Sequence, residues 1–228
     1  MKLSEQTVEV LKNFATINQS ILFQDGKELN TVAVQKNLLA SAKVPETFKS
    51  PNGEFAIYDL NEFLSTLSLF EDPEVEFGEQ YATISDSRAN TVYWFADKEI
   101  IVYPTSKIEM PDAEVEFTLT AESLDKLQRA TGTLGVPDLV IRRGTDDESK
   151  IVAEVLDKRN DTSNSYSLEV GDYSGDADFK FYFLTERMKM LPGDYNVQIS
   201  SKKISKLTAV PDGEVTYWIA LEQDSTYE

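Results

Sequence analysis

The chain of 228 residues contains no cysteine and no histidine. Without thiols or imidazoles it cannot supply a thiol nucleophile, a histidine-based catalytic triad or a zinc site of the Cys/His type. The phosphate-binding patterns G-x-x-x-x-G-K-[ST] and G-x-G-x-x-G are also absent. Any catalysis would therefore have to depend on carboxylates, lysine, tyrosine or serine.

Long apolar runs are missing as well. No stretch approaches the ~20 apolar residues of a membrane span, and the N-terminus has no apolar signal region. We therefore expect no membrane segment and a cytoplasmic location, which the absence of cysteine also fits. Apolar residues make up 41% of the chain, with 12 Phe and 10 Tyr, so a true hydrophobic core is expected.

Basic residues are scarce: 22 Lys and Arg stand against 40 Asp and Glu, giving a net charge of −18. Such an excess of acid argues at first sight against nucleic acid as a partner. The excess is shared by both halves but not by the expected helices, where acids and bases are nearly balanced. Those helix faces are either ordinary solvated surfaces or one surface adapted to tolerate a polyanion.

One local pattern occurs four times: a short apolar or alternating strand, a small polar residue, then an amphipathic stretch. The junctions lie near Ser4, Asn61, Thr120 and Thr185, about 57 to 65 residues apart, which is typical of a repeated supersecondary unit. The pattern predicts an α+β protein of two similar domains, each built from two strand–helix–strands units.

The domain boundary is predicted in the run I-I-V-Y-P-T-S-K-I-E-M-P, where prolines favour an extended connector. We expect an N-terminal domain at 1–100, a linker at 101–111 and a C-terminal domain at 112–228. The alternative is that this run is an edge strand. Helices are expected at 4–18, 61–70, 121–131 and 185–191. Strands are expected at 21–24, 31–35, 38–44, 55–60, 74–77, 81–84, 91–95, 114–120, 139–142, 151–156, 166–170, 179–184, 195–200, 204–210 and 215–221.

Several blocks of sequence occur together in a recognisable order. They are M-K-L-S…L-K-N-F-A-T-I-N, A-I-Y-D-L-N-E-F-L, Y-S-L-E-V-G-D-Y-S-G, M-K-M-L-P-G-D-Y and I-A-L-E-Q-D-S-T, which begin at residues 1, 56, 166, 188 and 219. In this combination the chain resembles the DNA polymerase sliding clamps, in particular those of T4-like bacteriophages. The resemblance runs from end to end, while 19–53 and 132–164 are less similar.

The resemblance implies a ring of three identical subunits whose helices line a hole for duplex DNA. It implies no catalysis, no cofactor and no metal. The implied partners are the replicative DNA polymerase, an ATP-driven clamp loader and late-transcription factors, in the cytoplasm of an infected bacterial host. Contact with DNA would be independent of base sequence, because such helices face the phosphate backbone.

The resemblance and the spacing together assign three groups of site residues. The cations expected to face DNA are Lys12, Lys126, Arg129, Arg187 and Lys189. The subunit interface is expected to join two edge strands through Thr91, Val92, Tyr93, Tyr166 and Leu168, although both strands could equally be internal. A pocket for a partner peptide is expected between the linker and the last strand, from Ile100, Ile101, Val102, Tyr103, Tyr217, Ile219 and Leu221, with the polar C-terminus as its mobile rim.

Two other functions remain open at this stage. One is an acidic scaffold protein of the same fold that holds no DNA. The other is a carboxylate-based hydrolase or metal-dependent nuclease, for which the acidic clusters are Asp146, Asp147 and Glu148 and then Asp172, Asp176 and Asp178. The second cluster superficially resembles a calcium loop, but its glycine is misplaced and no closing glutamate follows.

Overall fold

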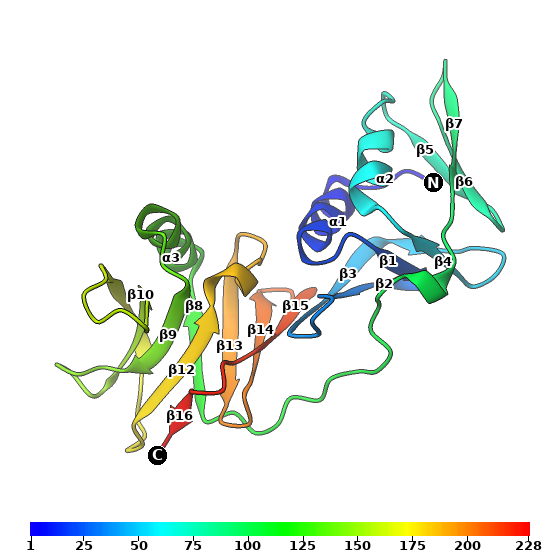
Figure 1. Cartoon of the computed structure of the whole chain (residues 1–228). Coiled ribbons are helices and arrows are strands. Elements are labelled where there is room, and N and C mark those ends of the chain that lie inside the picture. The colour runs from blue at the N-terminus through cyan, green and yellow to red at the C-terminus, as the bar shows by residue number, and fades with distance from the viewer. The chain divides into compact units, whose positions relative to one another are not determined.

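The computed structural model describes residues 1–228, which divide into two compact units, Met1–Lys107 and Ile108–Glu228 (Figure 1). The elements of the first unit are α1 (Glu5–Ile17), β1 (Ile21–Gln24), β2 (Gly26–Val32), β3 (Leu38–Phe48), β4 (Glu54–Ile57), α2 (Leu60–Leu67), β5 (Glu74–Phe77), β6 (Tyr81–Ser85), β7 (Asn90–Trp94) and the 3-10 turn η1 (Lys98–Ile100). The α+β class is thereby confirmed for this half.

The second unit contains one α-helix and more strands. Its elements are β8 (Val115–Leu119), α3 (Ala121–Leu134), β9 (Asp138–Arg143), β10 (Lys150–Leu156), β11 (Tyr166–Asp172), β12 (Phe179–Leu184), the 3-10 turn η2 (Thr185–Arg187), β13 (Asp194–Ser200), β14 (Ile204–Val210), β15 (Val215–Ala220) and β16 (Thr226–Tyr227). No helix of either unit is long and apolar enough to span a membrane.

Each α-helix begins where a polar side chain can accept a backbone N–H of the first turn. Ser4 caps α1 by accepting from the Thr7 N–H, Asp59 caps α2 and Thr120 caps α3. Such caps satisfy donors that have no partner inside the helix. The apolar side chains of α1 then fall on one buried face, which includes Leu11 and Phe14.

The prediction of a fourth helix at 185–191 is wrong, because only the three-residue turn η2 forms there. The residue at its N-cap position is Leu184, whose side chain cannot accept a hydrogen bond, and no side-chain cap is made. Pro192 and Gly193 follow closely and limit the length from the other side. The fourth unit is therefore a strand–turn–strands unit.

The sheets of the first unit are small and antiparallel. β1 pairs with β4, β2 with β3, and β5, β6 and β7 form a three-stranded sheet in that order. Strands β1, β4 and β5 contribute an aromatic core: the ring centroids of Phe23 and Phe55 lie 4.7 Å apart and those of Phe55 and Phe77 lie 4.5 Å apart, and both pairs are stacked.

Strand β2 covers 26–32 rather than the expected 31–35. The chain turns at Lys36, whose N–H donates to the Ala33 carbonyl, so the strand ends earlier.

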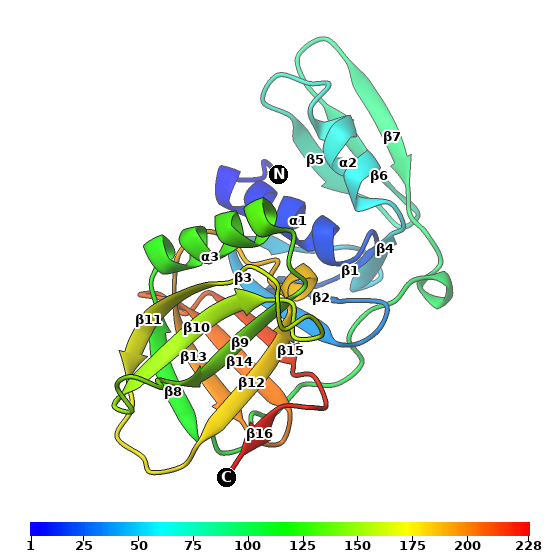
Figure 2. The same ribbon diagram turned by 60° about the vertical axis from the view of Figure 1, so that its left-hand side comes forward.

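The second unit has two antiparallel layers. One sheet has the order β11-β10-β9-β12-β16, and β15, β14, β13 and β8 follow one another in a second sheet. Helix α3 packs on β10 and β11, and Figure 2 shows it lying across these strands. Leu124 and Leu127 point from α3 into the core, where Phe179 and Phe181 are fully buried.

Candidate functional site

The exposed face of α3 carries two cations and two acids at helical spacing. Lys126 Nζ lies 2.6 Å from Glu122 Oε1, and an Arg129 guanidinium nitrogen lies 2.8 Å from Asp125 Oδ2. Hydrogen bonding to Lys126 and its positive charge lower the pKa of Glu122, and the same contact raises the pKa of Lys126. Both expected DNA-facing residues of this helix are thus at the surface, but each already has an anionic partner.

Of the other expected cations, two are exposed and one is not. Lys12 lies on the exposed face of α1, and Lys189 is exposed just after η2. Arg187 instead turns inward: its side chain is 14% exposed, pairs with Glu222 at 2.8 Å and donates to the Ala220 carbonyl. Because its guanidinium is engaged inside the second unit, Arg187 does not fit a role in facing phosphates.

The strands expected at the subunit interface lie at the edges of their sheets. β7 pairs only with β6, and β11 pairs only with β10. At the opposite edge of the β7 sheet, the backbone of Met1 exchanges hydrogen bonds with Val75. An unpaired edge is a template for another strand.

Along β7 the side chains alternate between two environments. Val92 and Trp94 are 46% and 64% exposed, whereas Thr91 and Tyr93 are half-buried. The Tyr93 hydroxyl donates to the Asp59 carbonyl, and burial followed by the nearby Glu62 carboxylate raises its pKa. The aromatic ring thereby fastens the edge strand to the first turn of α2.

On β11, Tyr166 is 36% exposed and Leu168 is half-buried.

Trp94, at the end of β7, was not among the expected interface residues, although a large aromatic side chain so exposed on an edge strand is a signal of contact. Its ring lies edge-on to that of Tyr81, which is also exposed. The alternation of β7 in the sequence could have indicated this face.

The residues expected to form the peptide pocket lie in different environments. Ile100 is 63% exposed, Val102 and Tyr103 are half-buried, and Ile101 is buried against Leu22 and Ala56. Ile101 is therefore part of the core of the first unit. The Val102 carbonyl accepts a hydrogen bond from the Asn18 side chain, which anchors the start of the linker.

Tyr217, Ile219 and Leu221 are 0%, 0% and 3% exposed inside the second unit. Burial raises the pKa of Tyr217 to about 12, and its hydroxyl accepts the Leu191 N–H. These three side chains are consequently inaccessible to a peptide. The C-terminus is also docked, because β16 pairs with β12 and Asp224 pairs with Lys158.

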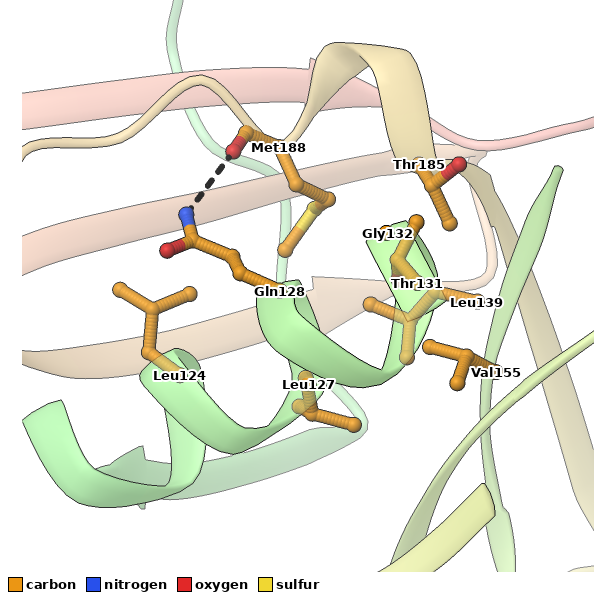
Figure 3. A pocket seen from close by; sticks show the side chains of 9 residues that line it. All are labelled: Leu124, Leu127, Gln128, Thr131, Gly132, Leu139, Val155, Thr185 and Met188. Atoms are coloured by element: carbon orange, nitrogen blue, oxygen red, sulfur yellow. Dashed lines mark hydrogen bonds between the residues drawn. The ribbon is translucent and has the colours of Figure 1, made fainter. Parts of the chain in front are cut away.

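A pocket that the sequence did not indicate opens between α3 and η2 (Figure 3). It has a volume of about 230 Å³. Its lining is mostly apolar and includes Leu124, Leu127, Leu139, Val155, Thr185 and Met188. The Gln128 amide donates to the Met188 carbonyl at 3.4 Å across its mouth. The pocket lies beside the truncated fourth helix, which explains why sequence analysis missed it.

The acidic clusters considered for hydrolysis or metal binding do not converge. The structure brings no three Asp or Glu side chains together in a way that could hold a metal ion. Asp147 accepts hydrogen bonds from Ser149, which lower its pKa, and Asp172 pairs with Lys150 at 2.7 Å. These carboxylates act locally, in a turn and in an ion pair between strands.

Comparisons with known proteins give matches to one family along nearly the whole chain. A family model described as "DNA polymerase processivity factor" matches residues 2–103, and one described as "gp45 sliding clamp, C terminal" matches 116–223. The sliding clamps of Escherichia phage RB69 and Enterobacteria phage T4 are 37% and 36% identical over 234 residues, covering 100% of this chain and of each relative. The sliding clamp of Vibrio phage KVP40 is 31% identical, covering 97% and 99%.

Solved structures share the fold at low sequence identity. Proliferating Cellular Nuclear Antigen from Entamoeba histolytica matches with a TM-score of 0.69 at 11% identity, covering 94% of each chain. The A. fulgidus PCNA bound to a C-terminal region of FEN-1 matches with a TM-score of 0.71 at 11% identity, covering 99% and 98%. The chain belongs to the sliding clamp family of DNA polymerase processivity factors.

Proposed function

We propose that three copies of this chain close head to tail into a ring that encircles duplex DNA and tethers the replicative DNA polymerase. The ring is opened and loaded by an ATP-driven clamp loader. The role requires no catalytic group, cofactor or metal, because a closed ring is held on DNA by its topology. Full-length similarity to three phage sliding clamps supports the proposal.

The observation that carries the proposal is the pair of unpaired edges, β7 in the first unit and β11 in the second. Head-to-tail closure needs two different surfaces on each copy, and a rotation that closes gives a ring. In our proposal β7 of one copy pairs with β11 of the next, with Thr91, Val92 and Tyr93 meeting Tyr166 and Leu168. Trp94 joins this group because of its exposure.

Weak contact with DNA is a requirement of this function rather than a defect. Each phosphate that a protein neutralises adds affinity and salt dependence, so many firm contacts would stop sliding. We propose that Lys12, Lys126, Arg129 and Lys189 face the duplex, and we leave Arg187 out because its guanidinium is engaged with Glu222. A chain with a net charge of −18 repels DNA elsewhere.

We propose the domain limits 1–100 and 112–228, with 101–111 as the linker between them. The separation of the chain into two compact units supports a boundary in this region. The relatives come from bacteriophages, so we place the protein in the cytoplasm of an infected bacterial host. Late-transcription factors are proposed as further partners by the same resemblance.

For the polymerase, we propose docking of a short apolar peptide beside the linker. Ile100 is the exposed anchor there, with Val102 and Tyr103 half-buried beside it. A few such anchors ordinarily dominate the binding energy of a peptide. Ile101 supports this surface from the core of the first unit and does not contact the peptide. Tyr217, Ile219 and Leu221 are buried inside the second unit, so we leave them out of the contact.

Retention on circular DNA tests the proposed function. After loading with the cognate loader and ATP, the protein is expected to remain on nicked circular DNA and to leave it once the circle is cut. Loss from both forms at the same rate would refute encirclement. It would favour the second candidate, an acidic scaffold of the same fold without DNA.

A further inference from the structure

The cations of α3 differ from Lys12 in one respect: each is paired with a carboxylate one turn earlier on the same helix. Glu122 precedes Lys126, and Asp125 precedes Arg129, at distances of 2.6 and 2.8 Å. The structure gives Lys12 no such partner. All four α3 side chains remain well exposed, between 43% and 76%.

Helix stability is a poor explanation for keeping both pairs. Exposed pairs of this spacing contribute little to the stability of a helix, because solvent screens them and both side chains lose freedom. Helix α3 is already fixed by the Thr120 cap, by Gly135 in the left-handed conformation at its end, and by its buried leucines. The pairs therefore contribute little to the fold, although their acids lie on the surface that we propose faces DNA.

The four charges of this face sum to zero. A phosphate that approaches Lys126 or Arg129 meets a cation already paired with a carboxylate, which it displaces or binds beside. In both cases the carboxylate stays within one helical turn of the phosphate and repels it, so the contact gives little affinity and releases few counterions.

We infer that Glu122 and Asp125 set the grip of the ring on DNA, acting as built-in competitors of phosphate for Lys126 and Arg129. The inference rests on the proposed function and deepens it. The two cations attract the phosphates when the duplex comes close, and the two acids keep that contact from becoming a firm ion pair. The result is a contact that is weak and nearly independent of salt, which suits rapid sliding.

The double variant Glu122→Gln/Asp125→Asn tests the inference, because it removes both competitors and keeps the side-chain shapes. Binding to a short linear duplex is measured with the purified ring, and diffusion of the loaded ring is followed on long DNA. Between about 50 and 200 mM salt we expect the variant to lose roughly tenfold more affinity than the wild type, as two additional phosphate contacts would give. It should also bind more tightly at low salt and diffuse more slowly.

The matched control is Asp72→Asn/Glu148→Gln. It likewise removes one acid that pairs with a lysine, Lys2, and one that pairs with an arginine, Arg143, but Asp72 lies in the bend between α2 and β5 and Glu148 in the turn between β9 and β10. The change in net charge is the same. We expect its salt dependence and diffusion to stay close to those of the wild type.

Three outcomes overturn the inference. If the α3 variant shows wild-type affinity, salt dependence and diffusion while the wild type is retained on circular DNA, the proposed function stands and only the inference fails. Equal effects of the control and the α3 variant would mean that net charge alone acts. Loss of the wild type from circular DNA at the linear rate would remove the proposed function and the inference together.

Discussion

Glu46 on β3 fastens the beginning of α1 to a strand forty residues away in the sequence. Its carboxylate accepts hydrogen bonds from the Ser4 N–H and from the Thr7 hydroxyl, so it completes the cap that Ser4 begins. Burial alone would raise the pKa of Glu46, but these hydrogen bonds outweigh it and lower the pKa below the ordinary 4.5. The stability of the first unit should therefore depend on this ionised group.

A carboxyl whose pKa is lower in the folded state stabilises the fold fully above its unfolded value of 4.5 and loses that effect as the pH falls through the folded value. We expect Glu46→Gln to lower the free energy of unfolding at pH 7 by about 1 kcal/mol, and by less in acid. Urea unfolding at pH 7 and at an acid pH below 4.5 measures this loss of stability. The control is Glu76→Gln, at an exposed position on β5. An equal loss at both pH values for Glu46→Gln would contradict the prediction.

At the level of single residues, the sequence predicted surface positions better than core positions. The spacing of Lys126 and Arg129 was sufficient to place both on the exposed face of α3, because helical periodicity is local. Ile101 was misassigned, since its partners Leu22 and Ala56 come from distant parts of the chain. The inward turn of Arg187 likewise depends on Glu222, which no local pattern connects to it.

Among the elements, the predicted helices form where a polar side chain caps them. The fourth does not form, because the hydroxyl of Thr185, the small polar residue expected at its start, donates to the Val136 and Pro137 carbonyls instead. Ser4 and Thr120 accept first-turn N–H groups, and α1 and α3 follow them closely as expected. At Leu184 the amphipathic pattern continues without a cap, and only η2 forms. The apolar face left beside α3 by the missing helix becomes the pocket of Figure 3.

Two glycines at the end of α3 allow a matched test of this element. Gly132 lies within the helix and a Cβ there would meet no atom within 4 Å, so Gly132→Ala should raise the free energy of unfolding by about 1 kcal/mol. Gly135 has equal space but a φ of 64°, so Gly135→Ala should lower it by about 1 kcal/mol. Chemical denaturation measures both. Stabilisation by both substitutions would contradict the assigned helix end.

For the whole molecule, the duplication was visible in the sequence because a local pattern recurs along the chain, and the resemblance indicated the two strands that we propose for ring closure. The sequence did not indicate which backbone groups of those strands face outward. Which backbone groups face outward depends on register. The Phe95 N–H donates to the Gln80 carbonyl, and hydrogen-bonded pairs alternate along antiparallel strands. The N–H and C=O of Val92 therefore point away from β6, toward the free edge. On β11 the same reasoning turns Leu168 toward β10 and Ser167 outward.

Replacing Val92 by proline should consequently prevent assembly without unfolding the subunit. Proline removes an N–H that no strand of the same chain uses, so the β6–β7 ladder stays intact while the proposed pairing with β11 of the next copy loses a hydrogen bond and meets the proline ring. Light scattering should give a trimer for the wild type and for the control Val92→Thr, and a monomer of unchanged circular dichroism for Val92→Pro. Ser167→Pro should behave in the same way from the other side of the interface, whereas Leu168→Pro should disturb the fold itself because it removes a bond to β10. A trimer that survives both Val92→Pro and Ser167→Pro would show that the copies meet through other surfaces.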